Sequence, residues 1–346
     1  NYILSAKELL SSLQESCKNG LIAISDSPEK TQDDQSSTVF ATLRTDFLSI
    51  LALLHAATTK VTLSLKPGSP QYKASLTPLK DLSNNVAALV HSIRLMQLTQ
   101  AKTILNEYES VAKSAIRAID SFICTVSSST SSDDCLRKAG EIHELIDHAR
   151  KPGSLSPDNQ AAVLKKWSQD HDSLKDGFEE LNELCQPEDA KDDLEDDGWD
   201  ELGFESNQKL SEEELARAVN IQTLIKIVVL LHQKVLKTTL SQKNRWPDPV
   251  LDDLADLSNV LLCSTDELIS SLYGNQNVEA IQGHSQSLLQ ALERLKAILL
   301  PQTQSSLEDR MAALSVSAPD EKVQKWFAMC FHQIEQAGRR TNPLQP

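Results

Sequence analysis

The stretch that decides the fold is SPDNQAAVLKKWSQDHDSLKDGFEELNELC, which spans residues 156–185. Spacings of three and four residues alternate along it without a miss and join Leu164, Trp167, His171, Leu174, Phe178, Leu181 and Cys185. Such spacing places these side chains on one face of an α-helix. The pattern is that of a heptad seam and stops after about three heptads. It favours one helix of a bundle, with a two-stranded coiled coil as the alternative.

The same periodicity recurs on both sides of this stretch. It predicts further helices at residues 3–19, 38–65, 77–96, 102–126, 134–149, from 212 onward, 248–272, 278–300 and 320–337. Alternation with period two is nowhere long enough to predict a strand. The sequence therefore predicts an all-α fold.

Start and stop signals frame these helices. Thr77 is a predicted cap with Pro78 at the first helical position. Residues 211–214, Ser-Glu-Glu-Glu, form a predicted capping box. An acid-directed kinase acting on Ser211 is a less favoured interpretation of the same residues. Gly274 is the expected C-terminal stop of the eighth helix.

The length of 346 residues suggests about two domains. Long helices joined by short connections pack as antiparallel neighbours, so ten of them suggest two bundles of about five. We place the boundary near residues 151–156, with the serine run at 127–132 as the competing choice. The predicted domains are 1–150 and 157–340, and the second contains an acidic loop at 186–210.

The acidic loop and the residues that follow it concentrate the charge of the chain. Residues 186–214 carry thirteen acidic side chains against two lysines, a net charge of −11 within a total of −15. One interpretation is a solvated connector. However, a connector gains nothing from exposing large apolar side chains, so these predict docking on the chain's own bundle or in a partner's groove flanked by basic residues. The candidate partner-binding residues are Leu194, Trp199, Leu202 and Phe204.

No residue constellation indicates a reaction, a cofactor or a metal. The glycine-rich phosphate loops and the nucleophile elbow are missing. In the sequence HELIDH, His143 and His148 are five residues apart, which on a helix leaves them about 140° apart and unable to share one zinc. We therefore predict no enzyme. The open alternative is a helical enzyme in which a cleft brings His143 or His171 beside buried carboxylates.

Charge and hydropathy argue against two further classes of partner. A chain with a pI near 5.0 lacks the basic surface that direct nucleic-acid binding requires. The most apolar stretch, residues 221–240, is interrupted by Lys226, His232, Lys234 and Lys237, so we expect no membrane span. The remaining histidines are expected to be isolated. The six scattered cysteines are expected to be buried, reduced thiols.

Five motifs in a shared order carry a resemblance to a known family. They are SPDNQAAV at 156–163, LKDGFEEL at 174–181, DGWDELGFESNQ at 197–208, LDDLADLS at 251–258 and STDEL at 264–268. In these motifs the chain resembles the cyclin-D-binding protein family, also called GCIP-like proteins. Each motif is moderately specific, and their order is the stronger signal.

The resemblance implies helical bundles of the talin, vinculin and α-catenin type. It also implies a non-enzymatic protein, shared between cytoplasm and nucleus, that binds D-type cyclins, signalling adaptors and helix-loop-helix factors and restrains the cell cycle. The alternative is a cytoskeletal or adhesion-type bundle that binds actin or adaptor proteins. Actin co-sedimentation would distinguish the two.

Overall fold

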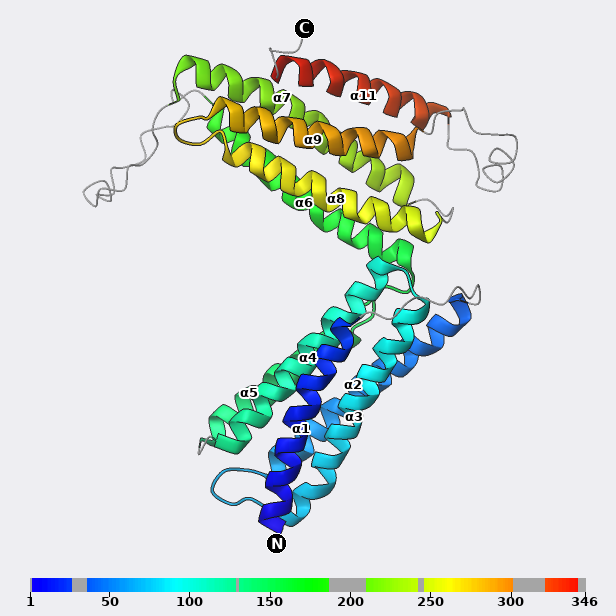
Figure 1. The fold of residues 1–346 in the computed structure, drawn as a ribbon, viewed down its shortest axis with the longest axis vertical. Coiled ribbons are helices and arrows are strands. Elements are labelled where there is room, and N and C mark those ends of the chain that lie inside the picture. Colours follow the sequence, from blue (N-terminus) through cyan, green and yellow to red (C-terminus); the bar gives the residue numbers. More distant parts are fainter. Residues whose placement is uncertain are drawn as a thin grey trace, which may run out of the picture. The chain divides into compact units, whose positions relative to one another are not determined.

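The computed structural model describes residues 2–26, 36–128, 131–186, 210–241, 246–300 and 321–341. All regular structure in these ranges is helical, and no strand occurs in them. The chain divides into two compact units, Asn1–Ala162 and Val163–Pro346, called here unit 1 and unit 2 (Figure 1). The predicted all-α fold is therefore confirmed. The division falls inside the sixth helix, C-terminal of the predicted boundary.

Five long helices make up the described part of unit 1. They are α1 (Tyr2–Ser25), α2 (Ser36–Ser64), α3 (Tyr72–Thr99), α4 (Lys102–Ser128) and α5 (Ser132–Arg150). α1 packs on α3 and α4, α2 packs on α3 and α5, and α4 packs on α5. The aromatic centre of the core is Tyr108, whose ring meets Phe40 and Phe47 edge to face. The Tyr108 hydroxyl donates to the carbonyl oxygen of Ser156 at 3.0 Å and so fastens the segment after α5 to this unit.

The C-terminal end of α1 is held by side chains of α3. A helix leaves its last carbonyl groups without internal partners, and α1 has no basic residue in its last turn. The Gln97 amide donates to the carbonyl of Ile24 at 2.8 Å, and Arg94 donates to that of Ala23 at 3.1 Å. Gln97 also donates to the carboxylate of Glu109 on α4 at 2.8 Å. Three helices therefore meet at one buried amide.

The described part of unit 2 contains most of α6 (Asn159–Leu184) and four further long helices. These are α7 (Glu212–Val235), α8 (Asp248–Ser270), α9 (Val278–Leu299) and α11 (Glu321–Thr341). A short π-helical segment, η3 (Leu236–Leu240), continues α7. α8 packs on α9, and α11 packs on α7 and α9. On α6 the seam residues Trp167, His171, Leu174 and Leu181 are buried. The seam therefore belongs to one helix of a bundle, as expected.

Capping explains several helix starts. Ser131 accepts from the backbone N–H of Asp134, and Asn277 accepts from those of Glu279 and Ala280. At α7 the predicted capping box is confirmed: Ser211 accepts from the N–H of Glu214, whose carboxylate accepts from the N–H of Ser211. Polar side chains at these positions fix the helix starts because they satisfy donors that the first turn leaves free.

One predicted helix start is wrong. α3 begins at Tyr72 rather than after Thr77, and Pro78 lies inside the helix. The N–H of Ser75 already bonds the carbonyl of Gln71, so the helix is established before the proline is reached. Pro78 has no N–H to donate, so the second turn of α3 lacks the hydrogen bond that this residue would otherwise make to the carbonyl four residues before it. The turn before α3 contains Gly68 at a φ of 89°, which favours glycine.

The expectation for the cysteines holds only in part. All six are free, and Cys17, Cys135 and Cys330 are buried, but Cys124 and Cys263 are exposed. Burial raises the pKa of Cys17 to about 12, so its thiol is protonated at neutral pH. The periodicity placed the two exposed thiols near an apolar stripe, but a stripe position alone does not decide burial.

Two helical segments, Phe40–Ser64 and Glu212–Leu240, are long and apolar enough to cross a membrane by length and composition alone. The expectation of no membrane span had excluded the second. Both segments also supply core residues, among them Phe47 and Leu51 in unit 1 and Ile221 and Val228 in unit 2. Buried core helices of this length meet the same criterion.

Candidate functional site

The four predicted partner-binding residues lie outside the described part of the chain. Leu194, Trp199, Leu202 and Phe204 all fall between residues 187 and 209. Their role in binding stays a prediction. Within the described ranges, charged and titratable side chains gather at three places. These are a surface groove in unit 1, a histidine contact beside it and a polar cluster in the core of unit 2.

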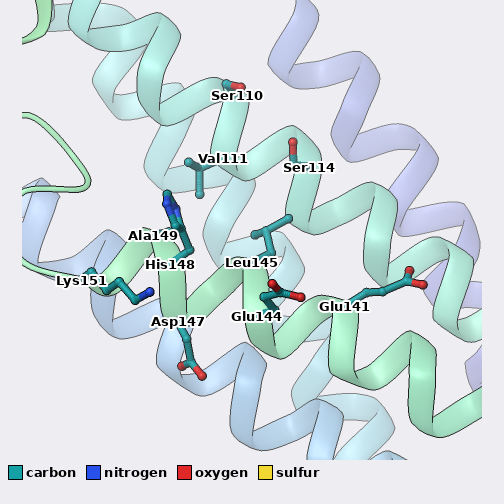
Figure 2. A pocket seen from close by; sticks show the side chains of 10 residues that line it. All are labelled: Ser110, Val111, Ser114, Glu141, Glu144, Leu145, Asp147, His148, Ala149 and Lys151. Atoms are coloured by element: carbon teal, nitrogen blue, oxygen red, sulfur yellow. The ribbon is translucent and has the colours of Figure 1, made fainter. Parts of the chain in front are cut away.

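The groove lies between α4 and α5 and has a volume of about 1010 Å³ (Figure 2). Its floor is apolar and consists of Val111, Leu145 and Ala149. Ser110 and Ser114 stand on the α4 side. The α5 side carries the charged and titratable groups of the groove, which are Glu141, Glu144, Asp147, His148 and Lys151. Helical spacing explains this set, because residues three, four and seven apart lie along one side of α5.

The carboxylates of the groove differ in their partners. Glu141 is 3.0 Å from Arg137 and 2.7 Å from Lys138. The hydrogen bond from Lys138, aided by Arg137, holds the pKa of Glu141 below its ordinary value. Glu144 is exposed and has no ion-pair partner among the described residues. Asp147 lies 3.9 Å from the Nε2 atom of His55 on α2. Two of the three carboxylates are therefore open to a new cation.

His143 and His148 point to different sides of α5. His143 faces α2, where its Nε2 atom lies 3.1 Å from the Thr59 hydroxyl and its ring stacks on that of His55 at 3.8 Å. His148 instead lines the groove between α5 and α4. The two rings therefore diverge, as the five-residue spacing predicts. Burial, followed by the neighbouring His55, lowers the pKa of His143 below its ordinary value.

A polar cluster lies where α6, α7 and α8 meet in unit 2. The Ser258 hydroxyl donates to the Asp170 carboxylate at 2.6 Å, and the Nε2 atom of His232 lies 3.1 Å from the Ser258 oxygen. On the solvent side of the cluster, the Nζ atom of Lys166 lies 3.0 Å from the Asp170 carboxylate. The indole of Trp167 stacks on His232 at 4.2 Å and donates to its backbone carbonyl at 3.0 Å.

The hydrogen bonds fix the protonation of this cluster. A serine hydroxyl has one proton, and that of Ser258 goes to Asp170, so the Nε2 atom of His232 must donate. His232 is then neutral, and its buried Nδ1 atom has no hydrogen-bond partner. Burial, together with the nearby ring of His171, lowers the pKa of His232 to about 3. The pKa of His171 is lowered too, first by burial. The expectation of isolated histidines is therefore wrong for His171 and His232, and it is also wrong for His55, which stacks on His143.

This arrangement differs from that of a serine nucleophile. In a catalytic triad the serine proton is directed to the histidine, which is held by the carboxylate. Here the serine stands between the other two groups, and its proton is directed to Asp170. Ser258 is fully buried, and His171, although next to Asp170 in sequence, stacks on His232 at 5.6 Å. The cluster joins three helices, and burial keeps the Ser258 hydroxyl away from any substrate.

The described residues contain no group of three or more His, Cys, Asp or Glu side chains that could hold a metal ion. The polar cluster could have been suspected from the sequence. Ser258 lies four residues after Leu254 and three before Leu261, on the apolar face of its helix. A polar residue in such a position needs a buried partner. The identity of the partner could not be read, because Asp170 is 88 residues away.

The structure thus defines a class: a protein of two all-helical units, each with its own hydrophobic core. Two family models match the chain. The model described as Grap2 and cyclin-D-interacting, N-terminal, matches residues 46–187, and the C-terminal one matches residues 195–297. The chain belongs to the Grap2 and cyclin-D-interacting family, as the resemblance in its motifs indicated. No curated protein matches the chain.

Proposed function

We propose that this chain is a protein-binding scaffold that binds a D-type cyclin and a Grap2-type adaptor and thereby restrains cell-cycle progression. One observation carries the proposal. The N-terminal and C-terminal family models together span parts of both units. The family description names both kinds of partner. Helix-loop-helix factors are further partners that the resemblance in the motifs suggests.

The acidic segment is the first place where we expect a partner to bind. Trp199, Leu202 and Phe204 fall within the residues matched by the C-terminal model, and Leu194 falls just before them. Large apolar side chains supply most of the binding energy at protein interfaces, and a surrounding acidic sequence selects basic partners. The segment therefore combines apolar anchor residues with negative charge that favours basic partners.

The proposal includes a non-enzymatic role, and two features of the described chain support it. Ser258 of the polar cluster is fully buried, so its hydroxyl is out of reach of a substrate. The groove on unit 1 is wide and open to solvent, whereas catalytic sites are usually enclosed. We further propose that the protein acts in both cytoplasm and nucleus, without direct contact to nucleic acid or membrane.

Affinity capture tests the proposal. The tagged full-length chain is expressed in the source cell and its bound proteins are identified by mass spectrometry, with a D-type cyclin expected among them. The double variant Trp199→Ala/Phe204→Ala should reduce cyclin recovery. Tyr273→Ala, which removes an exposed aromatic side chain elsewhere in unit 2, is the matched control.

The outcomes separate the two proposed roles. Unchanged recovery with the double variant removes the acidic segment from the interface, and failure to recover any D-type cyclin rejects the partner assignment. Co-sedimentation with actin filaments in the absence of cyclin binding would instead support a cytoskeletal bundle.

A further inference from the structure

We infer that the α4–α5 groove of unit 1 docks a basic amphipathic helix of a partner protein. This inference rests on the proposed scaffold function and assigns to it a second binding site with a definite ligand chemistry. The residues that would make the contacts are all described by the structure, unlike those of the acidic segment.

The dimensions of the groove favour a helix. Its α5 wall runs from Glu141 to Lys151, which at 1.5 Å per residue is about 15 Å, or roughly three helical turns. It lies open along one side, so a small molecule would leave much of its surface in water. Small-molecule sites instead bury most of their ligand. An amphipathic helix can place one apolar face in a groove and leave its other face solvated.

The lining of the groove supplies both an apolar floor and a charged edge. Figure 2 shows Val111 and Leu145 between the two helices, with Ser110 and Ser114 on the opposite wall from the carboxylates. Val111 and Leu145 are half-buried in the free chain, so part of each side chain remains for a partner to cover. Short serine side chains on the α4 wall leave room for the partner's own side chains.

Charge complementarity selects a basic partner. Glu141, Glu144 and Asp147 follow one another at intervals of three residues, so they form a stripe along α5. Glu144 has no ion-pair partner among the described residues, and Asp147 has only the distant contact to His55. Lysines or arginines three to four residues apart on a partner helix would match this spacing.

The charges of the groove are uneven along α5. Lys151 and His148 lie at one end, and Glu141 at the other end is already paired with Arg137 and Lys138. A basic residue of the partner is therefore disfavoured over Lys151 and favoured over Glu144 and Asp147. The best-fitting helix has its basic residues over this middle part of the groove.

The test uses the full-length chain and a designed peptide. The probe is a helical peptide of about 15 residues, long enough to populate a helix, with leucines on one face flanked by lysines and a photo-crosslinking group on the leucine face. Its twin carries glutamates in place of the lysines. Fluorescence anisotropy gives the Kd, and mass spectrometry locates the crosslink.

Two variants and one control address the groove. The triple variant Glu141→Gln/Glu144→Gln/Asp147→Asn should weaken binding of the lysine peptide about tenfold at low ionic strength, because exposed ion pairs each contribute a small factor. Ser110→Arg/Ser114→Arg should abolish the crosslink by filling the groove and adding like charge. The control Glu8→Gln/Glu15→Gln/Asp46→Asn neutralises exposed carboxylates on α1 and α2 and should change nothing. Circular dichroism verifies that each variant is folded.

The inference is supported if the lysine peptide crosslinks to α4 or α5, the glutamate twin does not, and only the groove variants reduce binding. It is overturned if the crosslink maps elsewhere, such as the acidic segment, or if the α1/α2 control has the same effect as the triple variant. Self-association of the chain that the peptide does not displace, measured by analytical ultracentrifugation, would also overturn it if the groove variants abolish it. Cyclin capture by the same variants is measured in parallel, because intact capture with a lost crosslink leaves the proposed function standing.

Discussion

Acid should destabilise unit 2 through one buried side chain. His232 has an ordinary pKa of 6.5 when exposed, and burial lowers it to about 3 in the folded chain. The folded state therefore binds its proton less readily than the unfolded state. The stability that neutral His232 allows is fully present above pH 6.5 and is lost as the pH falls from 6.5 toward 3. The loss amounts to about 2 kcal/mol at pH 5 and to roughly 5 kcal/mol below pH 3.

Tryptophan fluorescence measures this loss in unit 2 alone. All four tryptophans follow Ala162 in the sequence, namely Trp167, Trp199, Trp246 and Trp326. Urea unfolding followed by this signal at pH 7 and pH 5 gives the two free energies of unfolding, while far-ultraviolet circular dichroism reports both units. The wild-type midpoint should fall markedly at pH 5.

The variant His232→Gln isolates the cause. It should be less stable at pH 7, because it loses the stack on Trp167 and the bond to Ser258, but its stability should change by about 2 kcal/mol less between pH 7 and pH 5. His332→Gln, on the exposed face of α11, should behave as the wild type. Equal pH dependence in the His232 variant and the wild type would refute the reasoning, because the proton uptake would then belong to other groups.

Three substitutions test the packing and capping of the helices by thermal or urea unfolding. Gly20→Ala should destabilise unit 1 by about 1–3 kcal/mol, because its Cβ atom would lie 2.8 Å from the Val90 side chain at the α1–α3 contact. An unchanged free energy of unfolding would mean that α3 can shift away from α1 without cost. Gly140→Ala on α5 meets nothing within 4 Å and should stabilise by about 0.5–1 kcal/mol, so a loss would contradict the open surface there. Ser211→Ala should cost about 1 kcal/mol in unit 2 by breaking the capping box with Glu214, and Ser211→Thr should restore most of it.

The helices were predictable because their signals are local. Periodicity and caps located nearly every helix, and the end of α1 at Ser25 rather than Asn19 shows what local signals miss. Nothing in the sequence of α1 indicates that Gln97 and Arg94, more than seventy residues away, donate hydrogen bonds to the carbonyl oxygens of its last turn. These hydrogen bonds from α3 stabilise the last turn of α1, which the local sequence pattern does not predict to be helical.

The candidate sites were less predictable for the same reason. The groove exists because α4 and α5 lie side by side, and neither helix alone carries a sign of it. In the polar cluster the residues stand on expected helical faces, but their pairing depends on how three helices meet. For the acidic segment the situation is reversed. Its composition makes it easy to find in the sequence, but its candidate partner-binding residues lie outside the described part of the structure.

The packing of α1 and α11 has a practical consequence for anyone trimming this protein for expression. The residues matched by the family models run from 46 to 297 and so omit α1, the first part of α2 and the whole of α11. A fragment cut at those limits would strip one helix from each unit and uncover the faces of α3, α4, α7 and α9 that these helices contact. Aggregation of such a fragment would result from these exposed apolar faces and would not be a property of the intact chain.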